Sequence, residues 1–225
     1  FRIEEIMDKR GSLNRQLVLG LLIICMAPFA VNLAGLDFSS TKTPLPTGAI
    51  KTDDLFYAIA GAFHHALLEW SAVSIAFLTA IASFLHYYFR RDISVPIMGL
   101  ATLSAGAVDS FHTLAAARII EASAPNTDFI PFTWALSRIF NGCIMIAGVT
   151  ASLWLMNKNR VLAKSNENGI RIIIIMAAFF IGLAYVTVHL AAKNANLPQT
   201  MFPHALVTRP FDVLPLGIFI FASVL

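Results

Sequence analysis

Charged residues are scarce in this chain: Asp, Glu, Lys and Arg together make up 13% of its 225 residues, whereas 57% are hydrophobic. A soluble domain of this length cannot hide so much apolar surface in its core. The chain also lacks an internal repeat, low-complexity tracts and the ten-residue alternating segments of a membrane β-barrel. These absences exclude an ordinary soluble domain and favour a bundle of membrane helices, because helices satisfy their backbone polar groups internally in lipid.

Cysteine is nearly absent as well. Cys25 and Cys143 both lie in apolar runs without CxxC or histidine spacing, so we interpret them as small core residues rather than a disulfide or a ligand pair. No small-residue cleavage pattern follows the first apolar run, which argues for a spanning helix rather than a signal peptide. The formal charge of +3 comes from basic residues in short loops, so it excludes nucleic-acid binding and indicates membrane orientation instead.

Five apolar runs are long enough to span a bilayer, and a sixth begins near Val213 and is cut off by the end of the sequence. We therefore predict an all-α, polytopic transmembrane bundle of at least six helices with the last one truncated. A cytoplasmic segment, residues 1–16, would precede a transmembrane domain at 17–225. The five complete runs are residues 17–34, 56–89, 95–117, 133–156 and 170–192.

The basic residues are distributed unevenly between the two sides that these runs define. If the N-terminus is cytoplasmic, the inner segments hold ten Lys and Arg residues and the outer segments five, with Arg138 inside the fourth run. This bias favours a cytoplasmic N-terminus in the bacterial inner (plasma) membrane, with the lipid bilayer as the main partner. The outer loop at 193–212 has three prolines and no helical period, and such a loop either covers a site or only connects two helices.

Polar side chains converge on one depth near the predicted outer face. Counting about 20 residues outward from each inner end of a run places them there. The convergent residues are His65, Glu69, Asp109, His112, Arg138, Asn141 and His189. Ionisable groups within a membrane cost several kcal/mol unless they are paired or solvated, so by default they mark a functional interior.

The spacing of these residues places them in pairs on shared helix faces. His65 and Glu69 are four residues apart, whereas Asp109 and His112 are three apart. Arg138 and Asn141 are also three apart, and we interpret them as a structural pair in which Arg138 neutralises Glu69 or Asp109.

Imidazoles together with carboxylates are the ligand set of zinc, non-haem iron or copper. Two histidines from different helices are also the axial ligands of a haem. We predict a transition metal or haem bound mainly through His65, His112 and His189, with Glu69 and Asp109 as further ligands or as acceptors that fix the imidazole tautomer. A polar network that binds no ligand is the alternative.

The other three histidines are not among the main predicted ligands. His64 is turned by about 100° from His65 on an ideal helix, so it either ligates a second centre or faces the lipid interface. His204, in the loop at 193–212, is an additional ligand if that loop folds over the site. His86 lies at the predicted inner interface among aromatic and basic residues, and we exclude it from the site.

Three segments in order, "HHALLEW" (64–70), "GLATLSAGAVDSFHTLAA" (99–116) and "FTWALSRIFNG" (132–142), resemble the membrane-associated sensor domains of the third MASE class. The resemblance covers roughly residues 56–145 and maps the family's paired His and Glu onto His65 and Glu69. Its Asp and His fall on Asp109 and His112, and its aromatic-plus-Arg element on Trp134 and Arg138. After the fifth run, "FPHALVTRPFDVLPLGIF" departs from the family pattern.

The resemblance implies an N-terminal sensory input module, non-catalytic in itself, fused to a cytoplasmic output domain of the diguanylate cyclase or histidine kinase type. It supplies no ligand. Because helix-borne signalling usually runs through dimers, we expect a homodimer by analogy.

An intramembrane metal-dependent hydrolase, similar to the alkaline ceramidases, is the main competing hypothesis. Ser110, Asp109, His112 and His189 would build its zinc site, although a late HxxxH pair is not present in this sequence. A transporter is less well supported, because the sequence shows no inverted repeat and only Gly99 and Gly106 interrupt the third run.

Overall fold

The structure is a computed structural model that describes residues 19, 20, 23, 26, 27, 30, 34, 52–162, 166–202 and 210–224. The chain divides into two compact units, Phe1–Gly61 and Ala62–Leu225. The predicted N-terminal segment, residues 1–16, lies outside the described residues. So does most of the predicted first helix, although the described positions between 19 and 30 are helical. The candidate site lies entirely within the second unit.

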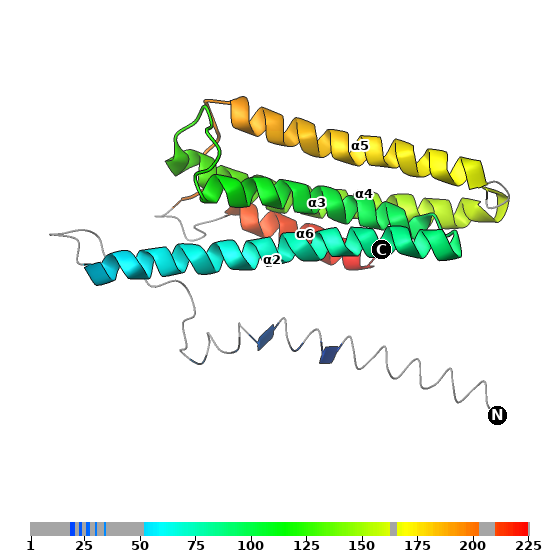
Figure 1. Ribbon diagram of the computed structural model, residues 1–225, viewed down its shortest axis with the longest axis horizontal. Coiled ribbons are helices and arrows are strands. Elements are labelled where there is room, and N and C mark those ends of the chain that lie inside the picture. Colours follow the sequence, from blue (N-terminus) through cyan, green and yellow to red (C-terminus); the bar gives the residue numbers. More distant parts are fainter. Residues whose placement is uncertain are drawn as a thin grey trace. The chain divides into compact units, whose positions relative to one another are not determined.

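The described part of the chain is all-α (Figure 1). Its five helices are α2 (Thr52–Arg90), α3 (Ser94–Ala116), α4 (Asn126–Leu162), α5 (Asn166–Lys193) and α6 (Pro210–Val224). Helices α2 to α5 are each long and apolar enough to cross a membrane. The all-helical prediction is confirmed, and the four candidate membrane spans agree with a multi-pass protein. Six helices are not shown, and α6 covers the start of the predicted sixth run.

A short connection folds α3 back along α2. Arg91 ends α2 in the left-handed region, with φ of 56°, and its backbone N–H still donates to the Tyr87 carbonyl at 2.9 Å. Asp92 then accepts hydrogen bonds from both the backbone N–H and the hydroxyl of Ser94, at 3.0 and 2.6 Å. The reversal therefore takes three residues and brings the two helices side by side.

Small residues let α2 and α3 approach closely. A Cβ added at Gly99 would overlap the Ser83 hydroxyl, and one added at Gly106 would lie 2.8 Å from the Ala76 Cβ. Membrane helices commonly pack through such small residues, because lipid supplies no hydrophobic force between them. This contact sets the rotation of α3 relative to α2, and with it the direction of every side chain on α3.

Helix α4 begins earlier than the hydropathy predicts. The sequence predicted a span from Thr133, but the helix starts at Asn126, and the Pro125 carbonyl accepts from the N–H groups of Asp128 and Phe129 at 3.0 and 2.9 Å. The added turns are held by a small apolar core in which the Phe129 ring, fully buried, meets the edge of the Phe111 ring. Thr133 is thereby within the helix rather than at its end.

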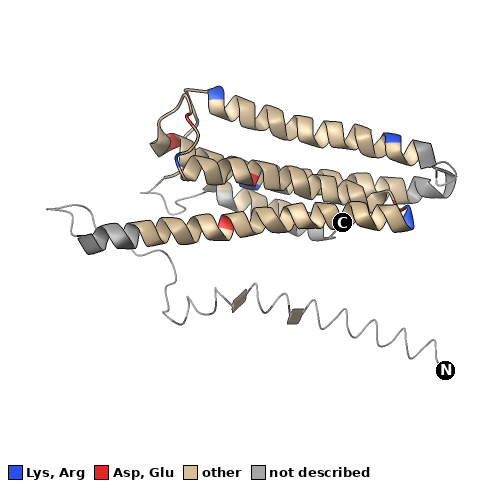
Figure 2. Ribbon diagram, in the orientation of Figure 1, with Lys and Arg blue, Asp and Glu red and all other residues tan. Residues whose placement is uncertain are grey.

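Helix α3 is the central element of the second unit, packing on α4 and α5, while α4 also packs on α6. Of the most apolar stretch of α3, 61% is buried, compared with 17% in both α2 and α5. The exposed faces of α2 and α5 carry large apolar side chains, as lipid contact requires. The few described charged residues lie mostly near the helix ends, and some lie within the bundle (Figure 2).

Candidate metal centre

Three of the predicted site residues meet where α2 lies against α3. His65, Glu69 and His112 each offer one ligand atom, and these atoms lie within 4.8 Å of one another. His65 and Glu69 are one turn apart on α2, and His112 faces them from α3. Their side chains range from half exposed at His65 to almost fully buried at His112. The predicted convergence is therefore confirmed for these three residues.

Glu69 is the central member of this group. Its Oε1 atom lies 3.5 Å from Nε2 of His65 and 3.5 Å from Nε2 of His112. Its Oε2 atom accepts a hydrogen bond from the Thr113 hydroxyl at 2.9 Å. Oε1 itself is buried and has no hydrogen-bond partner in the described structure. A buried carboxylate oxygen without a donor is costly, so this atom needs a proton or a cation.

The hydrogen bonds around His112 determine which of its nitrogens is free. The Thr133 hydroxyl donates to the Ile130 carbonyl at 3.0 Å, so its oxygen can accept from His112 Nδ1 at 2.9 Å. A neutral imidazole that donates through Nδ1 has its lone pair on Nε2. In this tautomer Nε2 is an acceptor 3.5 Å from Glu69 Oε1, which also carries lone pairs. Two acceptors that face each other across 3.5 Å are the arrangement that a metal ion between them would satisfy.

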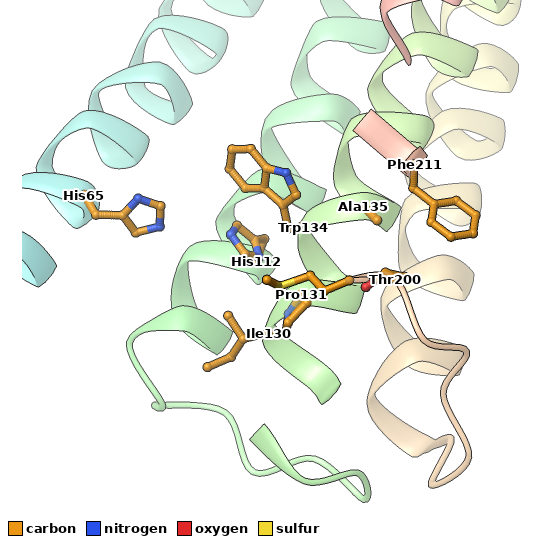
Figure 3. Close-up of a pocket in the computed structure, with 9 residues that line it drawn as sticks. His65, His112, Ile130, Pro131, Trp134, Ala135, Thr200 and Phe211 are labelled. Carbon is orange, nitrogen blue, oxygen red and sulfur yellow. The ribbon is translucent and has the colours of Figure 1, made fainter. Parts of the chain in front are cut away.

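A cavity of about 500 Å³ borders the group (Figure 3). His65 and His112 contribute to its lining, together with Thr200 and a wall of apolar residues from α4, α6 and the segment after α5. The apolar lining residues are Ile130, Pro131, Trp134, Ala135, Met201 and Phe211. The candidate metal-binding group, His65, Glu69 and His112, therefore has one side that opens into space large enough for a small molecule.

Asp109 belongs to a different set of contacts. Its carboxylate accepts hydrogen bonds from the Ser137 hydroxyl and from Asn141 Nδ2, the latter at 2.8 Å. Asp109 therefore contacts α4 only, whereas His112, on the same helix, contacts Glu69 of α2 through Nε2 and Thr133 of α4 through Nδ1. Asp109 is not among the residues whose ligand atoms come together at Glu69. The Ser110 hydroxyl donates to the Gly106 carbonyl of its own helix at 2.7 Å.

Arg138 has a different partner from the one predicted. Its guanidinium carbon lies 4.2 Å from the centroid of the Trp134 ring, in a cation–π contact. The structure shows no ion pair from Arg138 to Glu69 or Asp109, both of which lie in the described part of the chain. Asn141, the other member of the predicted pair, is the one that reaches Asp109.

The remaining predicted histidines lie elsewhere. His189 stacks on Tyr185, one turn before it on α5, with ring centroids 5.6 Å apart, and does not join the metal-binding group. His64 is exposed on α2, with its ring against the edge of Phe63. His204 lies outside the described residues. His86, which was excluded from the site, is exposed near the end of α2.

Sequence reasoning missed the hydroxyl residues that complete the site. Thr113, Thr133 and Ser137 all donate or accept at the acidic and histidine side chains. Two of these residues could have been predicted from the sequence, because each is adjacent to, or one helical turn from, a residue already identified as part of the site. Thr113 follows His112, and Ser137 is four residues before Asn141 on the same face of α4.

Comparison of the chain with protein-family models, with curated proteins and with solved structures finds no match. Any assignment of function therefore rests on the geometry of the site and on the sequence itself.

Proposed function

We propose that this chain is a membrane-embedded sensory input module that binds a divalent transition metal through His65, Glu69 and His112. The observation that carries the metal assignment is the position of Glu69 Oε1, which is buried, lacks a hydrogen bond and lies 3.5 Å from Nε2 of both histidines. Two ligands of a tetrahedral zinc ion with bonds of about 2.0–2.1 Å are separated by about 3.4 Å. The Glu69–histidine separations are close to that value.

The geometry favours a bare ion over haem. In a haem with two histidine ligands, the imidazoles bind iron from opposite faces of the porphyrin. Here Glu69 Oε1 is equally close to both Nε2 atoms and lies where the porphyrin plane would have to pass. Two histidines and one carboxylate are instead the ligand set of catalytic zinc sites and of non-haem iron sites that keep positions open.

The sensory role in this proposal rests on the resemblance of three segments to membrane sensor domains. It is compatible with where the ligands lie, because a metal would connect α2 to α3 through the half-exposed His65. Metal binding would then restrain α2 against α3, and a restraint between two helices is a change that an output domain in the same chain can read. We include a bacterial inner-membrane location and a homodimer in the same proposal.

A metal-dependent hydrolase is the second candidate. The observation in its favour is that His65 and His112 also line the 500 Å³ cavity, so a tetrahedral ion held by three protein ligands would have its fourth position for water or substrate. Its predicted ligand set fits less well, because Asp109 and His189 lie outside the group formed by His65, Glu69 and His112. Zinc-loaded protein that hydrolyses amphipathic amides or esters, and loses this activity in Glu69→Gln, would favour the hydrolase.

Metal titration of the purified protein in detergent or nanodiscs tests the proposal. We expect one equivalent of Zn²⁺ by calorimetry and elemental analysis, and d–d absorption bands when Co²⁺ replaces it. His65→Ala removes a ligand from a half-exposed position, so the protein should still fold. It should nevertheless lose at least a hundredfold in metal affinity, more than the loss expected from a residue behind the ligands.

His86→Ala is the matched control, because His86 is an exposed histidine on the same helix and outside the group. It should bind metal like the parent. If the parent protein takes up no Zn²⁺ or Co²⁺, the three residues are a purely structural polar network. The same conclusion follows if His65→Ala binds metal as tightly as His86→Ala.

A further inference from the structure

The cavity beside the metal-binding group has features that restrict what it can hold. His65 and His112 lie in its lining, so a ligand inside it can reach the position on the metal that the three protein ligands leave free. The volume of about 500 Å³ is in the usual range for small-molecule sites. A ligand that binds the ion in this cavity requires the metal site of the proposed function.

The charge around the cavity favours an anion. A divalent ion bound by the single carboxylate of Glu69 keeps one positive charge. Arg138, which lies against Trp134 of the cavity wall, and Asp109 carry opposite charges and both lie outside the lining, so the charge of the ion itself decides. No acidic residue occurs among the described residues that line the cavity. A carboxylate on the free metal position would neutralise the ion and supply the oxygen ligand that it prefers.

The wall favours an apolar, ring-shaped body. Most of the lining is apolar, and the rings of Trp134 and Phe211 both contribute to it. Aromatic side chains gain from contact with another ring through edge-to-face or offset packing, beyond the burial of surface. The His112 ring already meets Trp134 in this way, with centroids 5.3 Å apart and planes at 67°.

Thr200 indicates that the ligand carries a second polar group. It is buried, it lines the cavity, and its hydroxyl oxygen has no hydrogen-bond partner in the described part of the chain. A buried hydroxyl is almost always hydrogen-bonded, so one in a cavity wall indicates a polar atom of whatever occupies the cavity. In Figure 3, Thr200 and His65 lie on opposite sides of the lining residues.

We infer that the cavity binds a small aromatic carboxylate that carries a hydroxyl group at the end remote from the carboxylate. The carboxylate takes the free position on the metal, the ring packs between Trp134 and Phe211, and the hydroxyl pairs with Thr200. In this proposal the sensed signal is the aromatic carboxylate. The metal is part of the receptor that binds it.

The test uses Co²⁺-loaded protein and two probes that differ by one hydroxyl, 3-(4-hydroxyphenyl)propanoate and 3-phenylpropanoate. Both should shift the Co²⁺ absorption bands through their carboxylates, and the hydroxylated probe should bind about tenfold more tightly, as expected for one buried hydrogen bond. Thr200→Val should remove that tenfold preference while it leaves the affinity for 3-phenylpropanoate and for Co²⁺ unchanged. Thr187→Val, at a threonine of α5 whose hydroxyl donates to its own helix at 2.8 Å, is the control and should keep the preference.

The three ways in which this test can fail are distinguishable. Protein that binds no Co²⁺ refutes the metal site, and the inference about the ligand with it. Protein that binds Co²⁺ but whose bands neither probe shifts refutes the carboxylate ligand alone. Equal preference for the hydroxylated probe in the parent and in Thr200→Val refutes the role of Thr200.

Discussion

Thr133 shows how much one hydroxyl group contributes to this site. Its hydrogen is used by the Ile130 carbonyl, which leaves its oxygen as an acceptor for His112 Nδ1. The hydroxyl therefore fixes both the tautomer and the ring orientation of His112, although it does not touch the proposed metal. Groups that hold a ligand histidine in this way commonly contribute a factor of about 10 to 100 in metal affinity.

Replacing Thr133 by Val removes the acceptor while keeping the shape of the side chain. We expect Thr133→Val to weaken Zn²⁺ binding by about 10- to 100-fold, because His112 loses the bond that directs its Nε2 lone pair toward Glu69. Competition against a chelator of known affinity measures the change. Thr102→Val, whose hydroxyl donates only to the Met98 carbonyl on its own helix, is the matched control. Equal affinities in the two variants would show that Thr133 does not orient the ligand.

At the scale of helices, the contact between α2 and α3 sets the distance between the metal ligands. His65 and Glu69 come from α2 and His112 from α3, so the group exists only if the two helices stay in register and in contact. Gly106 lies between the site and the connection at Arg91, at a point where a Cβ would be 2.8 Å from the Ala76 Cβ. A larger residue there must push the helices apart.

We expect Gly106→Val to lower the free energy of unfolding by about 1–3 kcal/mol, the usual cost of overpacking a tight contact. The same substitution should weaken Zn²⁺ binding, because it separates His112 from Glu69. Thermal unfolding in detergent and metal titration measure the two effects. Gly182→Val on α5 is the control for the loss of glycine, since a Cβ there meets nothing within 4 Å. A Gly106→Val protein with unchanged metal affinity would mean that α2 and α3 can separate without disturbing the site.

At the scale of the whole molecule, orientation in the membrane decides which compartment the cavity faces. Asn159 lies in the last turn of α4 and Asn196 lies just after α5, so the whole of α5 separates them. If α5 crosses the membrane, these two positions are on opposite sides. The bias of basic residues predicts that Asn196, at the same end of α5 as the metal-binding group, faces outward.

Single cysteines introduced at these positions test the orientation. In a background with Cys25 and Cys143 replaced, a membrane-impermeant thiol reagent applied to intact cells should label Asn196→Cys and spare Asn159→Cys. Cys143 has to be removed because it is exposed and free. Labelling of Asn159→Cys from outside, with Asn196→Cys protected, would invert the orientation and place the cavity toward the cytoplasm.

The sequence by itself determined the helices and the depth of their polar groups. Hydropathy and length are properties of each segment alone, so the four candidate membrane spans α2 to α5 could be predicted from their residues. The helical period placed His65 and Glu69 on one face, one turn apart, as the structure has them. Depth followed from counting along each helix, because its rise per residue is constant.

Only the tertiary structure decided which of these polar groups face one another. The predicted depth of a residue in the membrane does not determine how its helix is rotated about its own axis. Packing between helices determines that rotation, as at Gly99 and Gly106. Asp109 and His112 are about 60° apart around α3, so Asp109 reaches only Ser137 and Asn141 of α4, whereas His112 lies between α2 and α4 and reaches Glu69. For the same reason His189, although predicted at the same depth, lies against Tyr185 on α5. The candidate metal-binding group is thus three residues from two helices, brought together by the packing of α2 on α3.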